Sequence, residues 1–139
     1  MSITLTRENV VKAIEEAVEA KGRAYVYPLL PEGADEYGEF EYAICTYVRD
    51  GQPSCIVGHA LASLGVPVEI LAGLDAPPGG TGAYRALTGL AKDRVIEYRA
   101  EDWEFITGFL LEAQIHQDGG DSWGDALDKA RSYVGLVTA

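Results

Sequence analysis

Cys55 and His59 lie four residues apart in the stretch PSCIVGHALASLG, residues 53–65, near the start of a predicted helix. Residues at this spacing lie close to one face of a helix, so the imidazole could reach the thiol. A thiol at a helix N-terminus has a lowered pKa, and a nucleophilic thiol also needs a base within hydrogen-bonding distance. The residue types therefore allow a thiol enzyme in which Cys55 is the nucleophile, His59 is the base and His116 joins them through the fold. No signature of a known class of thiol enzyme is present, so we favour the alternative that Cys55 is a small buried residue at the start of a packed helix.

The same side chains could instead bind a metal ion. Together with Cys45 they form a set of two cysteines and two histidines, which are the ligand types of structural zinc sites. Zinc-binding sequences usually contain two closely spaced ligand pairs, whereas here Cys45 is alone on a predicted strand and His116 is alone on a predicted helix. The acidic segment 32–41 lacks the spacing of a calcium-binding loop. We therefore predict no bound metal ion and no cofactor.

A glycine-rich segment, residues 75–82, precedes a predicted helix that carries Arg85 in its first turn. Backbone N–H groups at such a helix start can bind a phosphate or another anion, and Arg85 is a candidate ligand-binding residue on this ground. The segment lacks the lysine of a phosphate-binding loop, and no strand directly precedes it as in a dinucleotide-binding turn. We favour a mobile loop for this segment.

Another candidate site lies in the stretch AQIHQDGGDSWGDAL, residues 113–127. Gln117 continues the apolar stripe of its predicted helix, so its amide is expected to point inward and to need hydrogen-bond partners. Gln117 and the adjacent Asp118 are therefore candidate ligand-binding residues on the wall of a polar pocket. We favour the alternative that both residues join the two helices of a hairpin by local hydrogen bonds, with Trp123 packed beneath them.

The hydrophobic pattern predicts an α+β fold that is rich in helices. A first helix begins after Thr6, which can cap it, and ends at Gly22. Further helices are expected after Ser54, after Pro67, at residues 82–91, and as a helical hairpin in the last third of the chain. Strands are expected at residues 24–30, 40–48 and 94–99. The first two strands are expected to pair in a small antiparallel sheet.

The chain has 139 residues, a length typical of one domain, and 22 acidic against 11 basic residues give it a net charge of −11. We therefore treat residues 1–139 as a single domain. Its negative field repels phosphate backbones and favours basic partners, so nucleic-acid binding is not expected. No apolar run is long enough to cross a bilayer, and no signal peptide is visible. These features predict a cytoplasmic protein with free thiols and no membrane partner.

Two segments together resemble a group of short uncharacterised proteins from actinobacteria and their bacteriophages. The shared features are a helix start P-S-C-[IL]-V-G, here residues 53–58, and a later hairpin A-Q-x-x-Q-D-x-G-x-x-W-x-x-A, here residues 113–126. The resemblance covers about the last two thirds of the chain. It implies a small phage or actinobacterial accessory protein, and it implies no activity and no catalytic residues.

From these features we predict a small acidic, non-enzymatic binding protein. The narrower hypothesis is a phage accessory factor that engages a host protein through its acidic surface. One alternative is a small enzyme or small-ligand-binding module that uses Cys55 and His59. Another alternative is a structural or assembly protein, for which the partner is a second copy of the chain.

Overall fold

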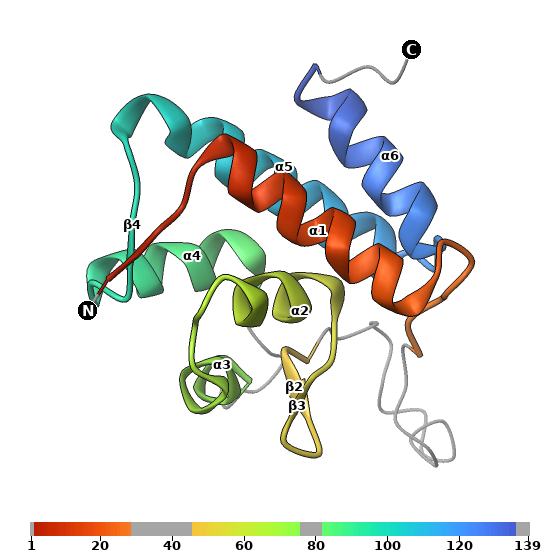
Figure 1. The fold of residues 1–139 in the computed structure, drawn as a ribbon, viewed down its shortest axis with the longest axis horizontal. Helices are drawn as coiled ribbons and strands as arrows, with labels where there is room; N and C mark the ends of the chain where they lie inside the picture. The colour runs from red at the N-terminus through yellow and green to blue at the C-terminus, as the bar shows by residue number, and fades with distance from the viewer. Residues whose placement is uncertain (1, 29–45, 76–81, 136–139) are drawn as a thin grey trace.

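Helices make up most of the computed structural model, which describes residues 2–28, 46–75 and 82–135 (Figure 1). In chain order the helices are α1 (Arg7–Lys21), α2 (Ile56–Ser63), α3 (Val68–Leu74), α4 (Ala83–Lys92), the short 3-10 helix η2 (Ala100–Asp102), α5 (Trp103–Asp118) and α6 (Trp123–Tyr133). The strands are β1 (Ile3–Thr4), β2 (Val48–Arg49), β3 (Gln52–Pro53) and β4 (Ile96–Glu97). The described residues thus form a helix-rich α+β fold with a C-terminal helical hairpin, α5–α6, as the sequence predicts.

Helix α1 begins and ends where the sequence predicts. The Thr6 hydroxyl accepts a hydrogen bond from the backbone N–H of Asn9, and the Asn9 side chain accepts one from the backbone N–H of Thr6. This reciprocal cap satisfies two N–H groups that have no partner inside the helix. Gly22 follows the helix with a φ of +93°, a conformation that glycine adopts without steric cost. Local signals at both ends therefore set the length of α1.

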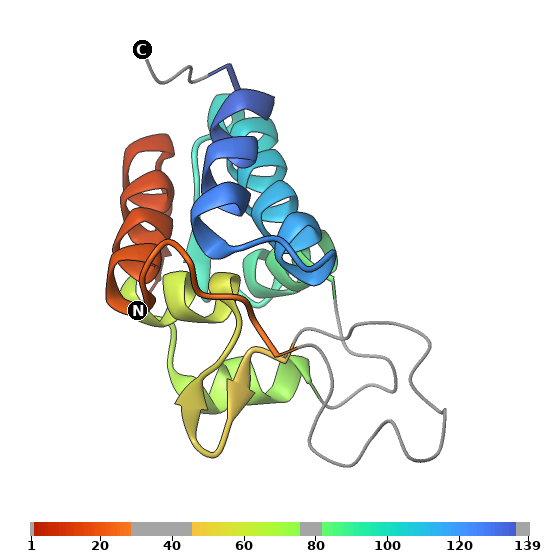
Figure 2. The ribbon, with the colours of Figure 1, turned by 90° about the vertical axis from the view of Figure 1, so that its right-hand side faces the viewer.

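Helix α5 is the centre of the fold, because it contacts α6, α4, α2 and α1. Figures 1 and 2 show α1, α5 and α6 in one layer and α2, α3 and the β2–β3 hairpin in a second layer, with α4 beside α5. The core between them is built from large side chains that are fully buried, among them Tyr27, Tyr47, Leu61, Leu87, Phe109 and Trp123. No helix in the described ranges is both long enough and apolar enough to cross a bilayer.

Strands β1 and β4 form a two-stranded parallel sheet in which Ile3 lies opposite Ile96. The N–H of Leu5 donates to the carbonyl of Glu97 at 2.8 Å, so the start of the chain is attached beside the segment that leads into α5. The sequence does not predict this pairing. The strand expected at residues 94–99 is confirmed only at its centre.

Strands β2 and β3 form an antiparallel hairpin whose turn consists of Asp50 and Gly51. Both residues have positive φ angles, +55° and +75°, as a two-residue turn of this kind requires. The small antiparallel sheet is therefore present as a hairpin. The expected pairing of segments 24–30 and 40–48 is wrong where the structure can test it, because the partner of β2 is β3.

The expected strand at residues 24–30 is also wrong in its described part. Residues 24–28 contain no strand and make one isolated antiparallel bridge, between Val26 and Ser122. That bridge places the segment beside the start of α6. Residues 40–45 of the other expected strand lie outside the described residues.

Candidate functional site

Cys55 is fully buried at the start of α2, as expected, but it is not a free thiol. Its sulfur is disulfide-bonded and accepts a hydrogen bond from the backbone N–H of Gly58 at 3.3 Å, so Cys55 is itself the helix cap. Ser54, the predicted cap, instead places its hydroxyl 2.9 Å from the Tyr27 hydroxyl. The prediction of free thiols is therefore wrong for Cys55. Cys45, the other cysteine in the sequence, lies outside the described residues.

His59 packs against an aromatic side chain, whereas in a thiol enzyme its ring would lie beside the thiolate. Its ring packs edge-on against Trp123, with 5.4 Å between the ring centroids. Burial lowers the pKa of His59, and the positive charge of Lys21 lowers it further. The imidazole thus stays neutral at pH 7 and lies against α6. Its Nε2 atom and the indole nitrogen of Trp123 are buried without a hydrogen-bond partner among the described residues.

His116 lies at the turn between α5 and α6. Its ring nitrogens are 3.6 Å from a carboxylate oxygen of Glu112 and 3.5 Å from one of Asp121. No described contact joins His116 to His59 or Cys55, so the three candidate catalytic residues do not assemble. Across residues 2–28, 46–75 and 82–135, no group of three or more His, Cys, Asp or Glu side chains is arranged to hold a metal ion.

Gln117 is fully buried, which confirms that its amide points inward. Its Oε1 atom accepts a hydrogen bond of 2.7 Å from the backbone N–H of Ile56, the first residue of α2. Its Nε2 atom donates to the Oδ1 atom of Asp118 at 2.7 Å. The predicted partner was the hairpin turn, but the amide instead joins α5 to α2. Gln117 thus satisfies an N–H group that the helix α2 leaves unpaired.

Gln114 has the same role at a second helix, and this role was not predicted from the sequence. Its Oε1 atom accepts a hydrogen bond of 2.7 Å from the backbone N–H of Ala83, the first residue of α4. Its Nε2 atom donates to the Tyr47 hydroxyl at 3.3 Å. Two signals were available: Gln114 precedes Gln117 by three residues and so shares its inward face, and Gly82 offers α4 no side-chain cap.

These contacts define a polar group, buried at Tyr47, Gln114 and Gln117 and half-buried at its two aspartates, that we call the glutamine cluster: Tyr47, Asp75, Gln114, Gln117 and Asp118. Asp75 accepts hydrogen bonds from the backbone N–H groups of Tyr47 and Val48 at 2.8 and 3.0 Å. Each of the five side chains therefore makes at least one hydrogen bond within the protein. The cluster joins the starts of α2 and α4 and the β2 strand to the central helix α5.

The chemistry available to the glutamine cluster is limited to one proton near neutral pH. Burial raises the pKa of Tyr47 to about 12, the hydrogen bond from Gln114 lowers it, and the negative charges of Asp75 and Asp118 raise it further. Burial also raises the pKa of Asp118 to about 6, against the opposing effect of the Gln117 hydrogen bond. Asp118 could therefore donate or accept a proton near pH 6.

Arg85 is exposed in the first turn of α4 and makes no ion pair within the described residues. One N–H group of the helix start that it was predicted to share with an anion is already used, because Gln114 accepts the N–H of Ala83. The rest of the glycine-rich segment, residues 76–81, lies outside the described residues. Arg85 therefore stays a candidate without a described site.

No family model, curated protein or solved structure matches this chain. An account of its function rests on its own residues. The resemblance to short actinobacterial and phage proteins stays a prediction. The glutamine cluster shows what the polar residues of one of its two motifs do in this fold. The A-Q-x-x-Q-D motif supplies both helix-capping glutamines and Asp118.

Asp118 is expected to make the stability of the protein depend on pH. Between about pH 4 and 6 the folded state holds a proton on this carboxyl that the unfolded state, with a pKa near 3.8, has released. The free energy of unfolding should therefore fall as the pH rises through this window. We expect Asp118→Asn to be more stable than wild type by about 1–2 kcal/mol at pH 7 and equal to it near pH 4; the partial exposure of Asp118 keeps the gain below the full pKa shift.

Urea unfolding at several pH values from about 4 to 7 measures this difference. The matched control is Asp93→Asn, which removes one carboxylate from an exposed position. A stability difference between Asp118→Asn and wild type that does not change with pH would contradict the burial of a carboxylate at this position.

Proposed function

One segment in the C-terminal part of the chain is rich in acidic side chains and has no basic one. Residues 100–128 contain eight acidic side chains and neither lysine nor arginine. Those side chains are Glu101, Asp102, Glu104, Glu112, Asp118, Asp121, Asp125 and Asp128. Some are paired with basic side chains from outside this range: Arg7 lies 2.7 Å from Asp102, and Lys129 lies 2.7 Å from Asp121. Glu112, Asp118 and Asp125 lie in the second half of α5 and the first turn of α6.

We call this surface the acidic end and define it as Glu112, Ile115, Asp121 and Asp125. Glu112 and Ile115 lie three residues apart on α5 and therefore share a face. Ile115 is 48% exposed, and the neighbouring His116 links its helix to Asp121. The acidic end thus combines an exposed apolar side chain with carboxylates, a combination that suits a protein contact.

We propose that this protein is a non-enzymatic binding protein that engages a basic partner protein through the acidic end. One observation carries the proposal: the residues suited to chemistry are used within the fold, whereas at the acidic end Ile115 and Asp125 are exposed and Glu112 and Asp121 are half-buried. Cys55 is disulfide-bonded and the glutamine cluster caps two helices. Carboxylates around Ile115 can steer a basic partner, and Ile115 can then lose its contact with water against it.

The resemblance to phage and actinobacterial proteins supports a narrower proposal, a phage accessory factor that engages a host protein. The alternative enzyme, which needs a thiolate at Cys55, finds no support in a disulfide-bonded cysteine. The assembly alternative predicts that the partner of the acidic end is a second copy of the chain. The experiment below separates these two partners.

We expect wild-type protein immobilised on beads to retain a basic protein from an actinobacterial lysate at about 50 mM salt and to release it at about 300 mM, because screening shortens the reach of exposed charges. The double variant Glu112→Gln/Asp125→Asn should lower the retained amount at least fivefold at the lower salt. Ile115→Ser should lower it by a similar factor at the lower salt. The measurement is quantitative mass spectrometry of the eluted proteins.

The matched control is Glu16→Gln/Glu19→Gln, which removes two exposed carboxylates from α1 and leaves the acidic end intact. Its retention should stay within about twofold of wild type. An equal loss in both double variants would indicate a general effect of net charge and would remove the acidic end from the proposal. Retention of the chain itself as the main partner would instead favour the assembly alternative.

A further inference from the structure

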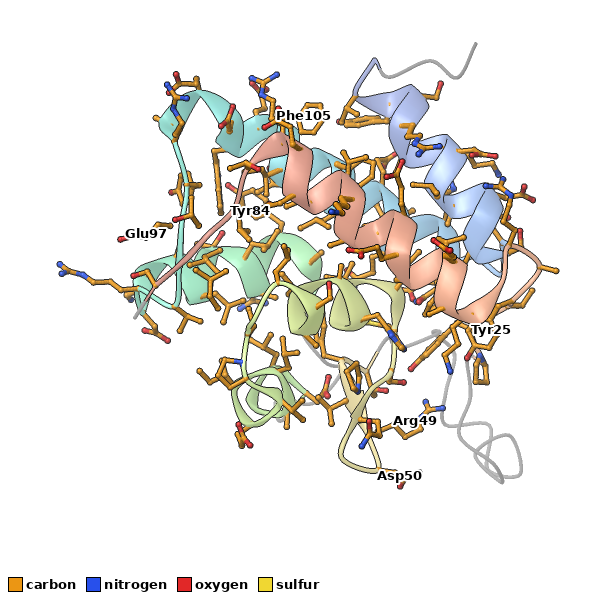
Figure 3. All side chains as sticks on the ribbon, viewed as in Figure 1. Tyr25, Arg49, Asp50, Tyr84, Glu97 and Phe105 are labelled. Atoms are coloured by element: carbon orange, nitrogen blue, oxygen red, sulfur yellow. The ribbon has the colours of Figure 1, made fainter. Side chains whose placement is uncertain are left out.

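A groove of about 580 Å³ lies beside the parallel sheet, at the opposite end of the molecule from the acidic end (Figure 1). Its walls come from β1, from the end of α4 and from β4 with the two residues that follow. Its lining includes the side chains of Thr4, Ala91, Arg94, Glu97, Tyr98 and Arg99. Figure 3 shows Glu97 directed outward from β4, away from the helices. The groove therefore opens to solvent along β4.

The groove lies in the part of the chain where basic residues prevail. Residues 82–99 contain four of the eleven basic side chains, at positions 85, 92, 94 and 99, and two acidic ones, at positions 93 and 97. The whole chain has a net charge of −11. The lining of the groove itself has two arginines, Arg94 and Arg99, against one acidic side chain, Glu97. Its charge is thus the reverse of that of the chain as a whole, which allows it to attract a short anionic group.

Arg94 occupies a backbone position that ordinarily belongs to glycine. The N–H of Arg94 donates to Ala91 O and the N–H of Val95 donates to Leu90 O, which is the hydrogen-bond pattern that closes a helix with a left-handed residue. Arg94 has a φ of +60°, which costs free energy in any residue with a Cβ atom. Its exposed side chain makes no ion pair in the described part of the chain. The fold gives no reason for arginine at this position, whereas a ligand in the groove does.

The opposite wall supplies a second guanidinium and an aromatic surface. Arg99 is 73% exposed and its one ion pair, to Glu101 at 3.3 Å, is a surface contact that water and salt weaken. Tyr98 stacks on Trp103 with 4.2 Å between the ring centroids, so its ring is held in place from behind. Two guanidinium groups and an ordered aromatic ring therefore line the same groove, a combination that suits a ligand with both carboxylates and apolar side chains.

We propose that this groove binds an acidic peptide segment of a partner protein, with its carboxylates on Arg94 and Arg99 and apolar side chains against Ala91 and Tyr98. Carboxylate and guanidinium groups can form paired hydrogen bonds, which makes arginine well suited to the role. An extended peptide presents alternate side chains to opposite sides, so acidic and apolar residues can contact different walls. Glu97 lies between the two arginines in sequence and disfavours a continuous polyanion such as nucleic acid.

The test uses fluorescence anisotropy with a labelled peptide of about eight residues that alternates glutamate and leucine. Arg94→Gly should weaken binding about tenfold, because it removes a guanidinium from the site. The same variant should raise the midpoint of thermal unfolding by about 2–4 °C, because glycine adopts the left-handed conformation more readily. Glu97→Gln should strengthen binding about threefold, because it removes a like charge. A loss of binding with a gain of stability cannot come from misfolding.

The matched control is Lys92→Gln, which removes one positive charge near the groove but not from its lining. Its affinity should stay within about twofold of wild type. The proposal is overturned if the peptide does not bind at about 50 mM salt. It is also overturned if Lys92→Gln weakens binding as much as Arg94→Gly, or if Glu97→Gln weakens it.

Two further measurements test other occupants of the groove. Tighter binding of a single-stranded oligonucleotide of equal charge, lost in Arg94→Gly, would overturn the proposal in favour of nucleic acid. Self-association in sedimentation that Arg94→Gly abolishes would overturn it in favour of a second copy of the chain. Absence of both effects, together with the peptide results above, supports the acidic peptide.

Discussion

Replacing Gly58 with alanine is expected to destabilise the protein by about 3 kcal/mol or more, because the new methyl group has no space. A Cβ atom at this position would lie 2.4 Å from the carbonyl oxygen of Tyr47 and 3.1 Å from its carbonyl carbon. These are backbone atoms, and they cannot rotate away as the end of a side chain can. The Tyr47 oxygen also accepts a hydrogen bond from the N–H of Ser54 at 2.9 Å, and the Tyr47 N–H donates to Asp75. Movement of this backbone would therefore break contacts on both sides.

The matched control is Gly89→Ala in α4, where a Cβ atom meets nothing within 4 Å. That variant should be more stable than wild type by about 0.5–1 kcal/mol, because alanine favours a helix interior. Urea unfolding of both variants and wild type gives the two differences, which should have opposite signs. If Gly58→Ala unfolds at the same urea concentration as wild type, α2 does not pack directly on the Tyr47 backbone.

The helices could be predicted from the sequence because their signals are local. Thr6 and Gly22 mark the ends of α1, and Ser122 caps α6 through the N–H of Asp125. Each signal involves residues within one or two turns of each other, so a periodic apolar pattern and a capping residue are sufficient. The cap of α2 was misplaced by one residue, from Ser54 to Cys55, because both side chains can accept a hydrogen bond from the helix start.

The strands could not be predicted in the same way. The parallel pair joins Ile3 to Ile96 through strands of two residues each, and two residues contain too little alternation to predict a partner so far along the chain. The hairpin was predictable, because Asp50 and Gly51 form the dipeptide that two-residue turns prefer. The following helix leaves room for a return strand of only two residues, and two residues on each side are enough for the hairpin.

The candidate site shows the same division between local pattern and tertiary contact. The apolar stripe of α5 predicts that Gln117 points inward, and it is fully buried. The stripe does not predict that the partner of Gln117 is the Ile56 N–H, because α2 and α5 come together only through the tertiary fold. The state of Cys55 was predicted from the cellular compartment and not from geometry, and that inference failed.

The two sequence motifs that carried the resemblance meet in the folded protein. The helix start at residues 53–58 includes Ile56, whose N–H is accepted by Gln117 of the hairpin motif at residues 113–126. This contact gives residues of both motifs a role in holding the fold together. This favours a search for function on the surface, at the acidic end and in the groove beside β4, where side chains have no role in holding helices together.

Replacing Gln117 with methionine is expected to cost about 2–3 kcal/mol, because methionine has a similar shape but no polar group for the start of α2. The Ile56 N–H, now 2.7 Å from the amide oxygen, would remain buried without an acceptor. Asp118 would lose the amide hydrogen bond that lowers its pKa, so its pKa should rise further above 6. Urea unfolding measures the first effect, and its dependence on pH measures the second.

The matched control is Gln52→Met, the same change at an exposed position in β3, where we expect a difference below about 0.5 kcal/mol. Gln117→Glu tests the direction of the hydrogen bond, because a carboxylate keeps an acceptor for the Ile56 N–H and loses the donor to Asp118. Two adjacent carboxyl groups then share a buried site, so this variant should approach wild-type stability near pH 4 and lose it as the pH rises. If Gln117→Met and wild type are equally stable, α2 does not need the Gln117 oxygen as an acceptor for the Ile56 N–H. The polar side chains of the glutamine cluster would then be available to bind a ligand.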